Sequence, residues 1–489
     1  MTKEFIVAIE LGSSKITGIA GKKNPDGSIS ILAVVKEDST SCIRKGVVFN
    51  IDKTVLCLTN IVKKLETSLK TNIARVYVGV GGQSIRSVKN IIVKTLPAET
   101  IVSQDMINEL MDANRSMSYA DQEILDAVTQ EYKVDSLYQL DPVGIPCLRL
   151  EGNFLNILWR KTFYKNLNQC INKAGMEIAE LYLAPLALAD AVLTETEKRS
   201  GCILVDLGAD TTTVLVYYKN ILRHLAVIPL GGENITKDIT SLLMEESQAE
   251  DMKLKYASAY TDNSDIDENK KYPIDSDRKV ESRKFIEIVE SRLQEIIENV
   301  FYQVPNEYAD KLIGGIILTG GGANMPNIEK AFTDQAPTEK IRIAKFVNLK
   351  INSNLPEITA HDATMNTILG LLAKGDINCA GEEINTDLFQ ATDAKHTATT
   401  PTQTKEPRSF TETSGTGIVQ TEEEKERLRK QKEAQEEAER LAKEEEERRI
   451  AEEKRQNSPM NKLWKGIKNF ARKITEEEEE NVGTMNSRY

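Results

Sequence analysis

The first 374 residues predict an α/β fold, and three features of the sequence lead to that prediction. Short apolar runs, typical of buried strands, alternate with longer segments in which apolar residues recur at helical spacing. Two strand–turn–strand patterns carry similar small polar turns, at Glu10–Lys15 and at Asp206–Thr213. A third buried strand ends in three glycines within Ile316–Asn324. The repeated hairpins indicate two related halves that face one ligand.

The individual elements follow from local patterns. Apolar stretches predict strands at Phe5–Ile9, Ile16–Ala20, Ile29–Val35, Val76–Val80, Ile203–Val205, Thr213–Tyr217 and Ile313–Leu318. Helical spacing predicts helices at Val55–Leu69, Lys165–Ala174 and Pro185–Thr196. Residues 261–280 are rich in Asp, Asn and Lys with little to bury, so we expect a solvated loop. After Lys374 the composition becomes polar, and the globular part is expected to end there.

Charge, cysteines and hydropathy exclude several classes of function. The formal net charge of -12 argues against binding along a nucleic-acid backbone, so we expect no nucleic-acid partner. The six cysteines form no CxxC pair and are expected to be small buried residues in a reducing cytosol. The N-terminal residues enter a strand pattern directly, without the features of a signal peptide. No apolar run reaches the roughly 18 to 20 residues that span a bilayer, so any membrane contact is expected to be peripheral.

Several loops carry residues suited to phosphates. The turn E-L-G-S-S-K, Glu10–Lys15, offers a glycine, two hydroxyls and a lysine. Backbone N–H groups exposed in such a turn hold anionic phosphates. Alone, this turn is more often an ordinary hairpin, because no helix follows it as in a Walker A loop. Asp206–Thr213 repeats the pattern, and Pro229–Thr236 places a glycine pair before a helix. The glycines after Ile316 let a base and ribose approach the backbone closely.

Taken in this order, the loops resemble those of the actin-like ATPase superfamily of actin, sugar kinases and heat-shock chaperones. Further segments are similar to the FtsA family of bacterial cell-division proteins: Q-E-Y-K-V-D (Gln130–Asp135), D-P-V-G (Asp141–Gly144), L-R-H-L-A-V-I-P-L-G-G-E-N-I-T-K-D-I (Leu222–Ile239) and the C-terminal amphipathic segment. The resemblance covers residues 1–375 and 460–474. It implies an actin-like two-lobed fold with duplicated ribonuclease-H-like domains and an FtsA-type inserted subdomain.

The resemblance implies a site for ATP and Mg²⁺. Residues carried over from the family are Gly12, Ser13, Ser14 and Lys15 for the β- and γ-phosphates; Gly208, Thr211 and Thr212 in the second phosphate loop; Gly231, Gly232 and Glu233 near the ribose or phosphates; and Gly320, Gly321 and Gly322 for the adenosine. Asp206 would hold Mg²⁺ through water. Glu250 and Lys253 occupy an A-E-x-x-K pattern that flanks the nucleoside in this superfamily, and an ordinary solvated pair is an equal alternative.

Hydrolysis is expected to be slow or absent. Actins orient the attacking water with a glutamine before the second phosphate loop, whereas Ala184–Ala189 reads A-P-L-A-L-A and has no polar side chain. Positioning supplies much of the catalysis in phosphoryl transfer, so its loss slows turnover. Catalytic residues are therefore unknown, and Glu10 and Asp206 are candidates for positioning metal and water.

The family organisation also implies a domain plan. A first actin-like domain is expected at 1–83 and 161–200, the inserted subdomain at 84–160, a second actin-like domain at 201–235 and 306–375, a small subdomain at 236–305, a charged linker at 376–459, an amphipathic helix at 460–474 and an acidic tail at 475–489. Family members bind the C-terminal peptide of the tubulin-like protein FtsZ on the small subdomain. The polar stretch 261–280 departs from the family, so no individual peptide contacts are assigned.

The C-terminal segment predicts membrane attachment from its own residues. Its apolar residues fall on one helical face: Met460, Leu463, Trp464, Ile467, Phe470, Ala471 and Ile474. Basic residues occupy the remainder: Lys462, Lys465, Lys468, Arg472 and Lys473. Such a helix lies in the interface of an anionic bilayer, and an ordinary core-facing helix is the less favoured alternative. The preceding Thr421–Gln456 predicts a helical linker rather than a coiled coil, because its a and d positions are not apolar.

With the C-terminal segment, the resemblance implies an actin-like ATP-binding cell-division protein that anchors FtsZ filaments to the cytoplasmic face of the inner membrane at the septum. Its expected partners are the FtsZ C-terminal peptide, further copies of itself, anionic lipid and later divisome proteins. A sugar kinase would need an aspartate base in a sugar pocket, for which no motif is found. A pilus-assembly relative shares the ATP loops without the amphipathic tail. A chaperone would need a β domain after residue 375, where the chain is too polar.

Overall fold

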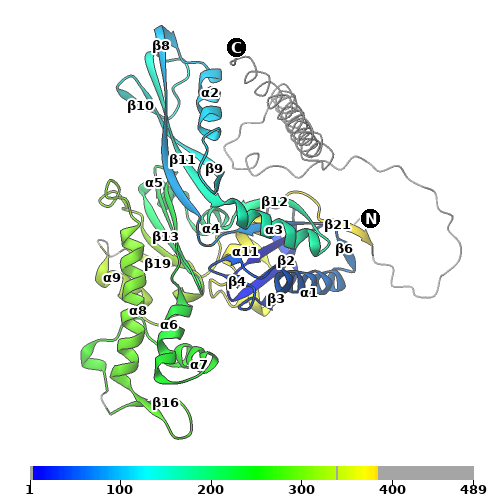
Figure 1. Ribbon diagram of the computed structural model, residues 1–489, viewed down its shortest axis with the longest axis vertical. Helices are drawn as coiled ribbons and strands as arrows, with labels where there is room; N and C mark the ends of the chain where they lie inside the picture. Colours follow the sequence, from blue (N-terminus) through cyan, green and yellow to red (C-terminus); the bar gives the residue numbers. More distant parts are fainter. Residues whose placement is uncertain (1–3, 268, 337–339, 384–489) are drawn as a thin grey trace, which may run out of the picture. The chain divides into compact units, whose positions relative to one another are not determined.

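A computed structural model describes residues 4–267, 269–336 and 340–383, and Figure 1 labels its elements. The expected linker at Thr421–Gln456, the amphipathic segment 460–474 and the acidic tail 475–489 lie outside these described residues. None of the described helices is both long enough and apolar enough to span a membrane.

The first half is built on a mixed sheet with the strand order β12-β7-β1-β2-β3-β20. An antiparallel meander comes first: β1 (Ile6–Leu11), β2 (Lys15–Lys23) and β3 (Ile29–Asp38). Parallel strands extend it: β7 (Arg75–Val80) and β12 (Glu177–Leu183) beside β1, and β20 (Ile351–Asn352) beside β3. Its helices are α1 (Ile51–Leu69), α3 (Lys161–Lys173), α4 (Ala184–Val192) and α11 (Asn366–Lys374).

The second half repeats this plan. The meander is β13 (Cys202–Leu207), β14 (Thr212–Tyr218) and β15 (Ile221–Ile228), and the parallel strands are β18 (Gly315–Thr319) and β19 (Ile341–Ile343). The order β15-β14-β13-β18-β19 therefore matches β3-β2-β1-β7-β12 strand for strand. The short η3 (Gly321–Asn324), α9 (Ile328–Gln335) and α10 (Pro356–Thr359) complete this region. The two related halves predicted from the two hairpins are confirmed.

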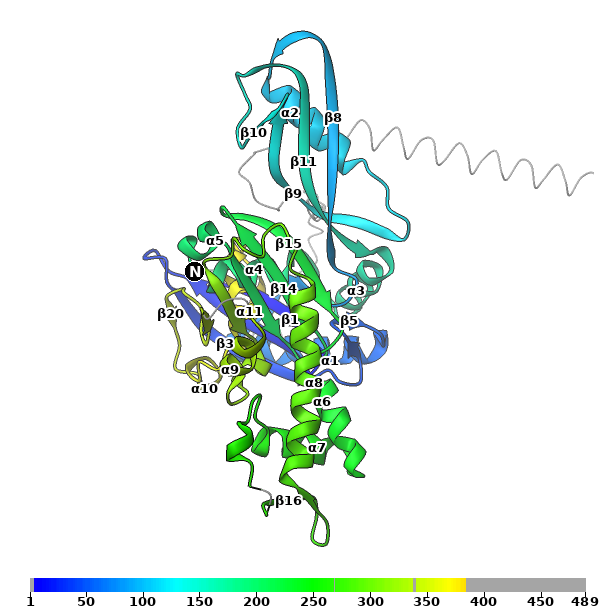
Figure 2. The ribbon, with the colours of Figure 1, turned by 90° about the vertical axis from the view of Figure 1, so that its left-hand side faces the viewer.

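An inserted subdomain leaves the first half after β7. Its elements are β8 (Arg86–Ile101), α2 (Gln104–Arg115), β9 (Gln122–Val134), β10 (Leu137–Gln139) and β11 (Pro146–Arg160). The strands β8, β11 and β9 pair antiparallel, and α2 packs on them (Figure 2). A separate apolar core, including Leu110, Leu150 and Phe154, holds the helix to the sheet. Pairing of Ala226 with Arg86 joins β8 to β15, so the insert continues the sheet of the second half.

A small helical region follows β15. It contains α6 (Gly232–Ile239), η1 (Thr240–Leu242), α7 (Glu246–Tyr256), η2 (Asn263–Asp265), β16 (Lys271–Pro273), β17 (Lys279–Glu281) and α8 (Ser282–Tyr302). The solvated loop expected at 261–280 is wrong in part. β16 and β17 pair as a hairpin there. Tyr272 and Val280 are buried in the core of this region. These two apolar side chains anchor a hairpin whose other residues are mostly polar.

Two further boundaries differ from expectation. The helix expected at Pro185–Thr196 is divided into α4 and α5 (Glu195–Ser200). α4 ends at Val192 with Leu193 as its C-cap, and Thr194 caps α5 through a capping box with Glu197, which explains the break. The ordered fold also continues past residue 375: β21 (Ala380–Glu383) pairs with β6 (Thr71–Ile73), and Cys379 is fully buried beside it.

Candidate functional site

The turn between β1 and β2 presents the first set of predicted phosphate residues. A Cβ atom added to Gly12 would lie 2.7 Å from the Lys15 carbonyl oxygen, so only glycine fits this tight turn. The Ser39 hydroxyl donates to the Gly12 carbonyl at 2.6 Å and holds the turn from behind. Ser14 and Lys15 are exposed at its tip. The turn therefore directs its hydroxyls and lysine outward.

The turn between β13 and β14 has the same local geometry. A Cβ atom on Gly208 would lie 2.7 Å from the carbonyl oxygen of Thr211. The Gly208 N–H donates to that oxygen at 2.9 Å. Thr212 is buried, and its hydroxyl donates to the Leu230 carbonyl at 2.9 Å. The two predicted phosphate turns are thus alike in the structure as they are in sequence.

The glycine pair at Gly231–Gly232 packs directly on the second turn. The N–H groups of Gly232 and Glu233 donate to the carbonyls of Gly208 and Ala209, at 3.0 and 2.8 Å. A side chain on Gly231 would collide with the Ala209 carbonyl, which explains a glycine there. These contacts fix the start of α6 against the turn.

The third glycine loop meets the same strand. Gly320 has φ +84°, and a side chain there would collide with the Asp206 carboxylate. Gly322 approaches Leu207, whose Cβ atom would lie 2.9 Å from an added Cβ. Gly321, by contrast, is exposed, and an added Cβ would meet only Thr364, at 3.9 Å. The structure therefore brings the predicted adenosine loop beside the second phosphate loop, with Gly321 facing open space.

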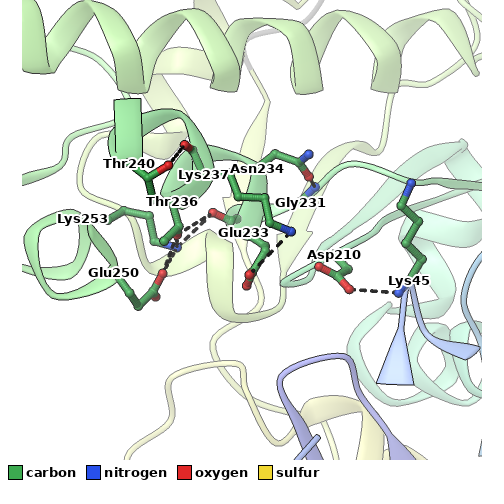
Figure 3. A network of polar contacts seen from close by, with 11 residues as sticks. Lys45, Asp210, Gly231, Glu233, Asn234, Thr236, Lys237, Thr240, Glu250 and Lys253 are labelled. Carbon is green, nitrogen blue, oxygen red and sulfur yellow. Dashed lines mark hydrogen bonds and ion pairs between the residues drawn. The ribbon is translucent and has the colours of Figure 1, made fainter. Parts of the chain in front are cut away.

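A contact that the sequence did not reveal joins the two halves. The Lys45 N–H donates to the Asp210 carboxylate at 2.9 Å (Figure 3), and the Gly46 N–H donates to the Ser13 hydroxyl oxygen at 2.9 Å. Ser13 belongs to the first phosphate turn and Asp210 to the second. The sequence signals only the two-residue turn Lys45–Gly46 between the apolar residues of I-R-K-G-V-V, and that pattern does not identify the partners of the turn.

Two carboxyl groups mark equivalent positions in the halves. Glu10 precedes Leu11 and Gly12, as Asp206 precedes Leu207 and Gly208. Burial, together with the charge of Asp206, raises the pKa of Glu10 to about 8, and burial raises the pKa of Asp206 to about 6. In the described part of the chain no cluster of three metal-ligating side chains is found.

A further acidic group lies at the start of α6. Burial raises the pKa of the Glu233 carboxyl to about 7, helped by a hydrogen bond with Glu246 and by the charge of Asp210, while Lys237 opposes the rise. The Lys237 ammonium lies 3.7 Å from the Glu233 carboxylate. The side of the site formed by the second half is therefore acidic, and it suits a ligand that arrives with a cation.

Glu250 and Lys253 lie behind the glycine pair. The Lys253 ammonium donates to the Gly232 carbonyl at 3.0 Å and to the Thr236 hydroxyl at 2.8 Å, and it lies 2.7 Å from the Glu250 carboxylate (Figure 3). Its side chain is only 10% exposed. The buried Lys253 therefore ties α7 to the loop, with the partly exposed Glu250 as its ion-pair partner, rather than forming a solvated surface pair.

The helix before the second phosphate turn is apolar, as its sequence indicates. Ala184, Pro185, Ala187, Leu188 and Ala189 of α4 are buried. Gly370 of α11 packs closely against the Ala187 carbonyl, where no side chain fits. Residues 184–189 therefore serve packing between α4 and α11.

Comparisons with known proteins agree with this architecture. The family described as "Cell division protein FtsA" matches residues 203–367, and "SHS2 domain inserted in FTSA" matches residues 82–158. The cell division protein FtsA of Porphyromonas gingivalis is 34% identical over 326 residues, which are 65% of this chain and 68% of that protein. The protein of the same name from Neisseria meningitidis serogroup B is 33% identical over 333 residues, 67% of this chain and 80% of that one.

Among solved structures, the PilM-PilN type IV pilus biogenesis complex matches with a TM-score of 0.52 at 14% identity, covering 76% of this chain and 98% of that one. At this low identity the likeness supports the fold alone.

Proposed function

The chain belongs to the FtsA family of bacterial cell-division proteins, and from this premise we propose that it is an ATP-binding protein that anchors FtsZ filaments to the cytoplasmic membrane during septum assembly. The single observation that carries the nucleotide part is the meeting of Gly12–Lys15, Asp206–Thr212, Gly231–Gly232 and Gly320–Gly322 at one site.

The residues present fit ATP with Mg²⁺. Gly320 and Gly322 leave no room for side chains, and Gly321 faces open space, as close approach of a nucleoside requires. Ser13, Ser14 and Lys15 would bind the outer phosphates, and Asp206 would hold Mg²⁺ through water. Bound Mg²⁺ would supply positive charge to the phosphates and to the Glu10 and Asp206 carboxyl groups, whose pKa values are raised. Glu10, at the equivalent place on β1, would hold a water near the ion.

Turnover is proposed to be slow or absent. The buried helix α4 offers no polar side chain at Ala184–Ala189 to orient an attacking water. Binding and release of nucleotide, rather than fast hydrolysis, would then control the state of the protein.

The remaining parts of the proposal rest on the family and on the sequence outside the described residues. The FtsZ C-terminal peptide would dock on the small subdomain at 236–305, and copies of the chain would associate head to tail through an open contact. Later divisome proteins would join this assembly. The amphipathic segment 460–474 would attach it to anionic lipid on the cytoplasmic face of the inner membrane.

A thermal-shift measurement tests the nucleotide site. ATP with Mg²⁺ at about 100 times its Kd stabilises a folded protein by about 2.7 kcal/mol, which raises Tm. Gly321→Asp and Asp206→Ala should each remove that rise, the first by placing a carboxylate in the open space of the adenosine loop. Asp26→Ala is the control, because Asp26 bonds only Ser28 in the far turn of the β2–β3 hairpin. If both site variants keep the full rise, the nucleotide binds elsewhere.

A further inference from the structure

A short hairpin of the first half ends between the two phosphate turns. Its strands are β4 (Ile43–Arg44) and β5 (Val47–Val48), and Lys45 and Gly46 form the two-residue tip. Both tip residues have positive φ, 48° and 73°, as a type I′ hairpin turn requires. Ile43, Val47 and Val48 are buried, so the base of the hairpin is fixed in the core of the first half.

The tip is also held from the side. The Gln83 N–H donates to the Lys45 carbonyl at 2.7 Å. Gly46 and Gly82 approach so closely that a side chain on either would collide with backbone of the other segment. The position of the tip is therefore set by the end of β7, which itself belongs to the first half. This leaves the two N–H groups of the tip as its contacts toward the phosphate turns.

Each of these N–H groups binds one phosphate turn. Gly46 donates to the Ser13 hydroxyl and Lys45 to the Asp210 carboxylate, both at 2.9 Å. Two adjacent residues thus connect a phosphate-turn side chain of the first half with one of the second. If the two phosphate turns move apart, one of these hydrogen bonds must lengthen, because the tip cannot move with both turns at once.

We infer that the Lys45–Gly46 tip couples the terminal phosphate of a bound nucleotide to the closure of the two halves, so that Lys45 and Asp210 act as positioning residues that favour a triphosphate over a diphosphate. This inference rests on the proposed ATP site.

The chemistry of the two contacts supports this role. A hydroxyl group accepts and donates at the same time, so acceptance from Gly46 directs the Ser13 hydrogen toward another acceptor, such as a phosphate oxygen. The bond from Lys45 holds the Asp210 carboxylate on the tip and so fixes the second phosphate turn relative to the first. A site arranged in this way before binding loses less free energy when the ligand orders it.

Two substitutions of Asp210 separate the bond from the charge. Asp210→Asn keeps an oxygen that accepts from Lys45 and removes the charge, whereas Asp210→Ala removes both. Isothermal titration calorimetry of the full chain with ATP and with ADP, each with Mg²⁺, gives the ratio of the two affinities. Asp210→Ala should lower the preference for ATP about tenfold, the size expected for one hydrogen bond to a charged group. Asp210→Asn keeps a weaker bond to a neutral oxygen, so it should retain more of the ATP preference than Asp210→Ala.

Asp26→Asn serves as the control for loss of a carboxylate remote from the tip, and Tm without nucleotide is recorded for every variant. If Asp210→Ala keeps the ATP preference, or if both Asp210 variants change it equally, the coupling role is overturned. If the unaltered chain binds neither nucleotide, the proposed ATP site fails and the inference fails with it. The two failures are distinguishable, because only the second appears without any substitution.

Discussion

Arg223 of β15 and Gln130 of β9 form a buried pair that joins the inserted subdomain to the second half. The guanidinium donates to the Gln130 side-chain oxygen at 3.3 Å, and the Gln130 amide donates to the Leu222 carbonyl at 2.8 Å. Arg223 is 3% exposed and Gln130 6%. The insert leaves and re-enters the chain of the first half, yet these bonds and the pairing with β15 attach it to the second. The insert is therefore expected to move with the second half.

Loss of Arg223 should be costly. Arg223→Met leaves the Gln130 oxygen without its buried donor and removes the partner of Glu131, 3.6 Å away. We expect a loss of about 3 kcal/mol in the free energy of unfolding, seen as a lower Tm in calorimetry. Lys311→Met is the matched control, because its exposed ammonium lies 5.8 Å from the same Tyr308 ring that Arg223 covers at 5.7 Å. Equal losses in the two variants would contradict a role for the buried pair.

The raised pKa of Glu233 predicts a pH dependence of stability. The pKa of Glu233 has its ordinary value of 4.5 in the unfolded chain and is about 7 in the fold. Folding favours the protonated form of a carboxyl group whose pKa is higher in the fold than in the unfolded chain. The stability that Glu233 contributes is therefore fully present below pH 4.5 and is lost as the pH rises to about 7. Glu233→Gln removes that loss, and it should be more stable than the unaltered chain by about 1 kcal/mol at pH 8 and by nothing near pH 4.5.

Urea denaturation of Glu233→Gln across this pH range checks the prediction. Asp251→Asn is the control, since it removes an exposed carboxylate from the nearby α7. A stability difference for Glu233→Gln that does not grow between pH 5 and pH 7 would mean that the carboxyl group is not held in its protonated form.

The sequence predicted the parts of the site that repeat within it. Glu10-Leu11-Gly12 and Asp206-Leu207-Gly208 could be recognised as equivalent because a tight hairpin turn needs its glycine at a fixed place. The contact of Lys45 with Asp210 could not be predicted, because 165 residues separate them and the bond uses a backbone N–H that every residue but proline carries. The burial of Tyr272 could not be predicted from composition either, because the polar content of residues 261–280 does not indicate where a single aromatic side chain packs.

Tyr272 should matter for the stability of the small region and not for its ligand. Its ring lies 4.8 Å from that of Tyr256 and 5.2 Å from that of Phe285. Tyr272→Ala should lower the free energy of unfolding by about 3 kcal/mol, because a buried aromatic side chain leaves a cavity. The rise in Tm with ATP and Mg²⁺ should remain, because the predicted nucleotide residues lie on other elements than this hairpin.

Tyr302→Ala provides the comparison for Tyr272→Ala. Tyr302 ends α8 and is 85% exposed, so its truncation should change Tm little. A loss of the ATP response in Tyr272→Ala alone would show that the hairpin supports the nucleotide site.

Membrane attachment is the last prediction, and it rests on the residues of 460–474. Trp464 and Phe470 fall on the apolar face of the predicted helix, and a carboxylate at each would lie in the acyl boundary of the bilayer. Each large apolar side chain adds roughly 1 kcal/mol or more when buried, and each basic residue near an anionic surface adds about 1 kcal/mol.

Trp464→Glu with Phe470→Glu should therefore release the full chain from anionic vesicles in a flotation assay, while ATP with Mg²⁺ still raises Tm. The matched variant Asn461→Glu with Asn469→Glu changes the charge equally but spares the apolar face, so it should retain more binding. Flotation of the first variant at the level of the unaltered chain would place the anchor elsewhere.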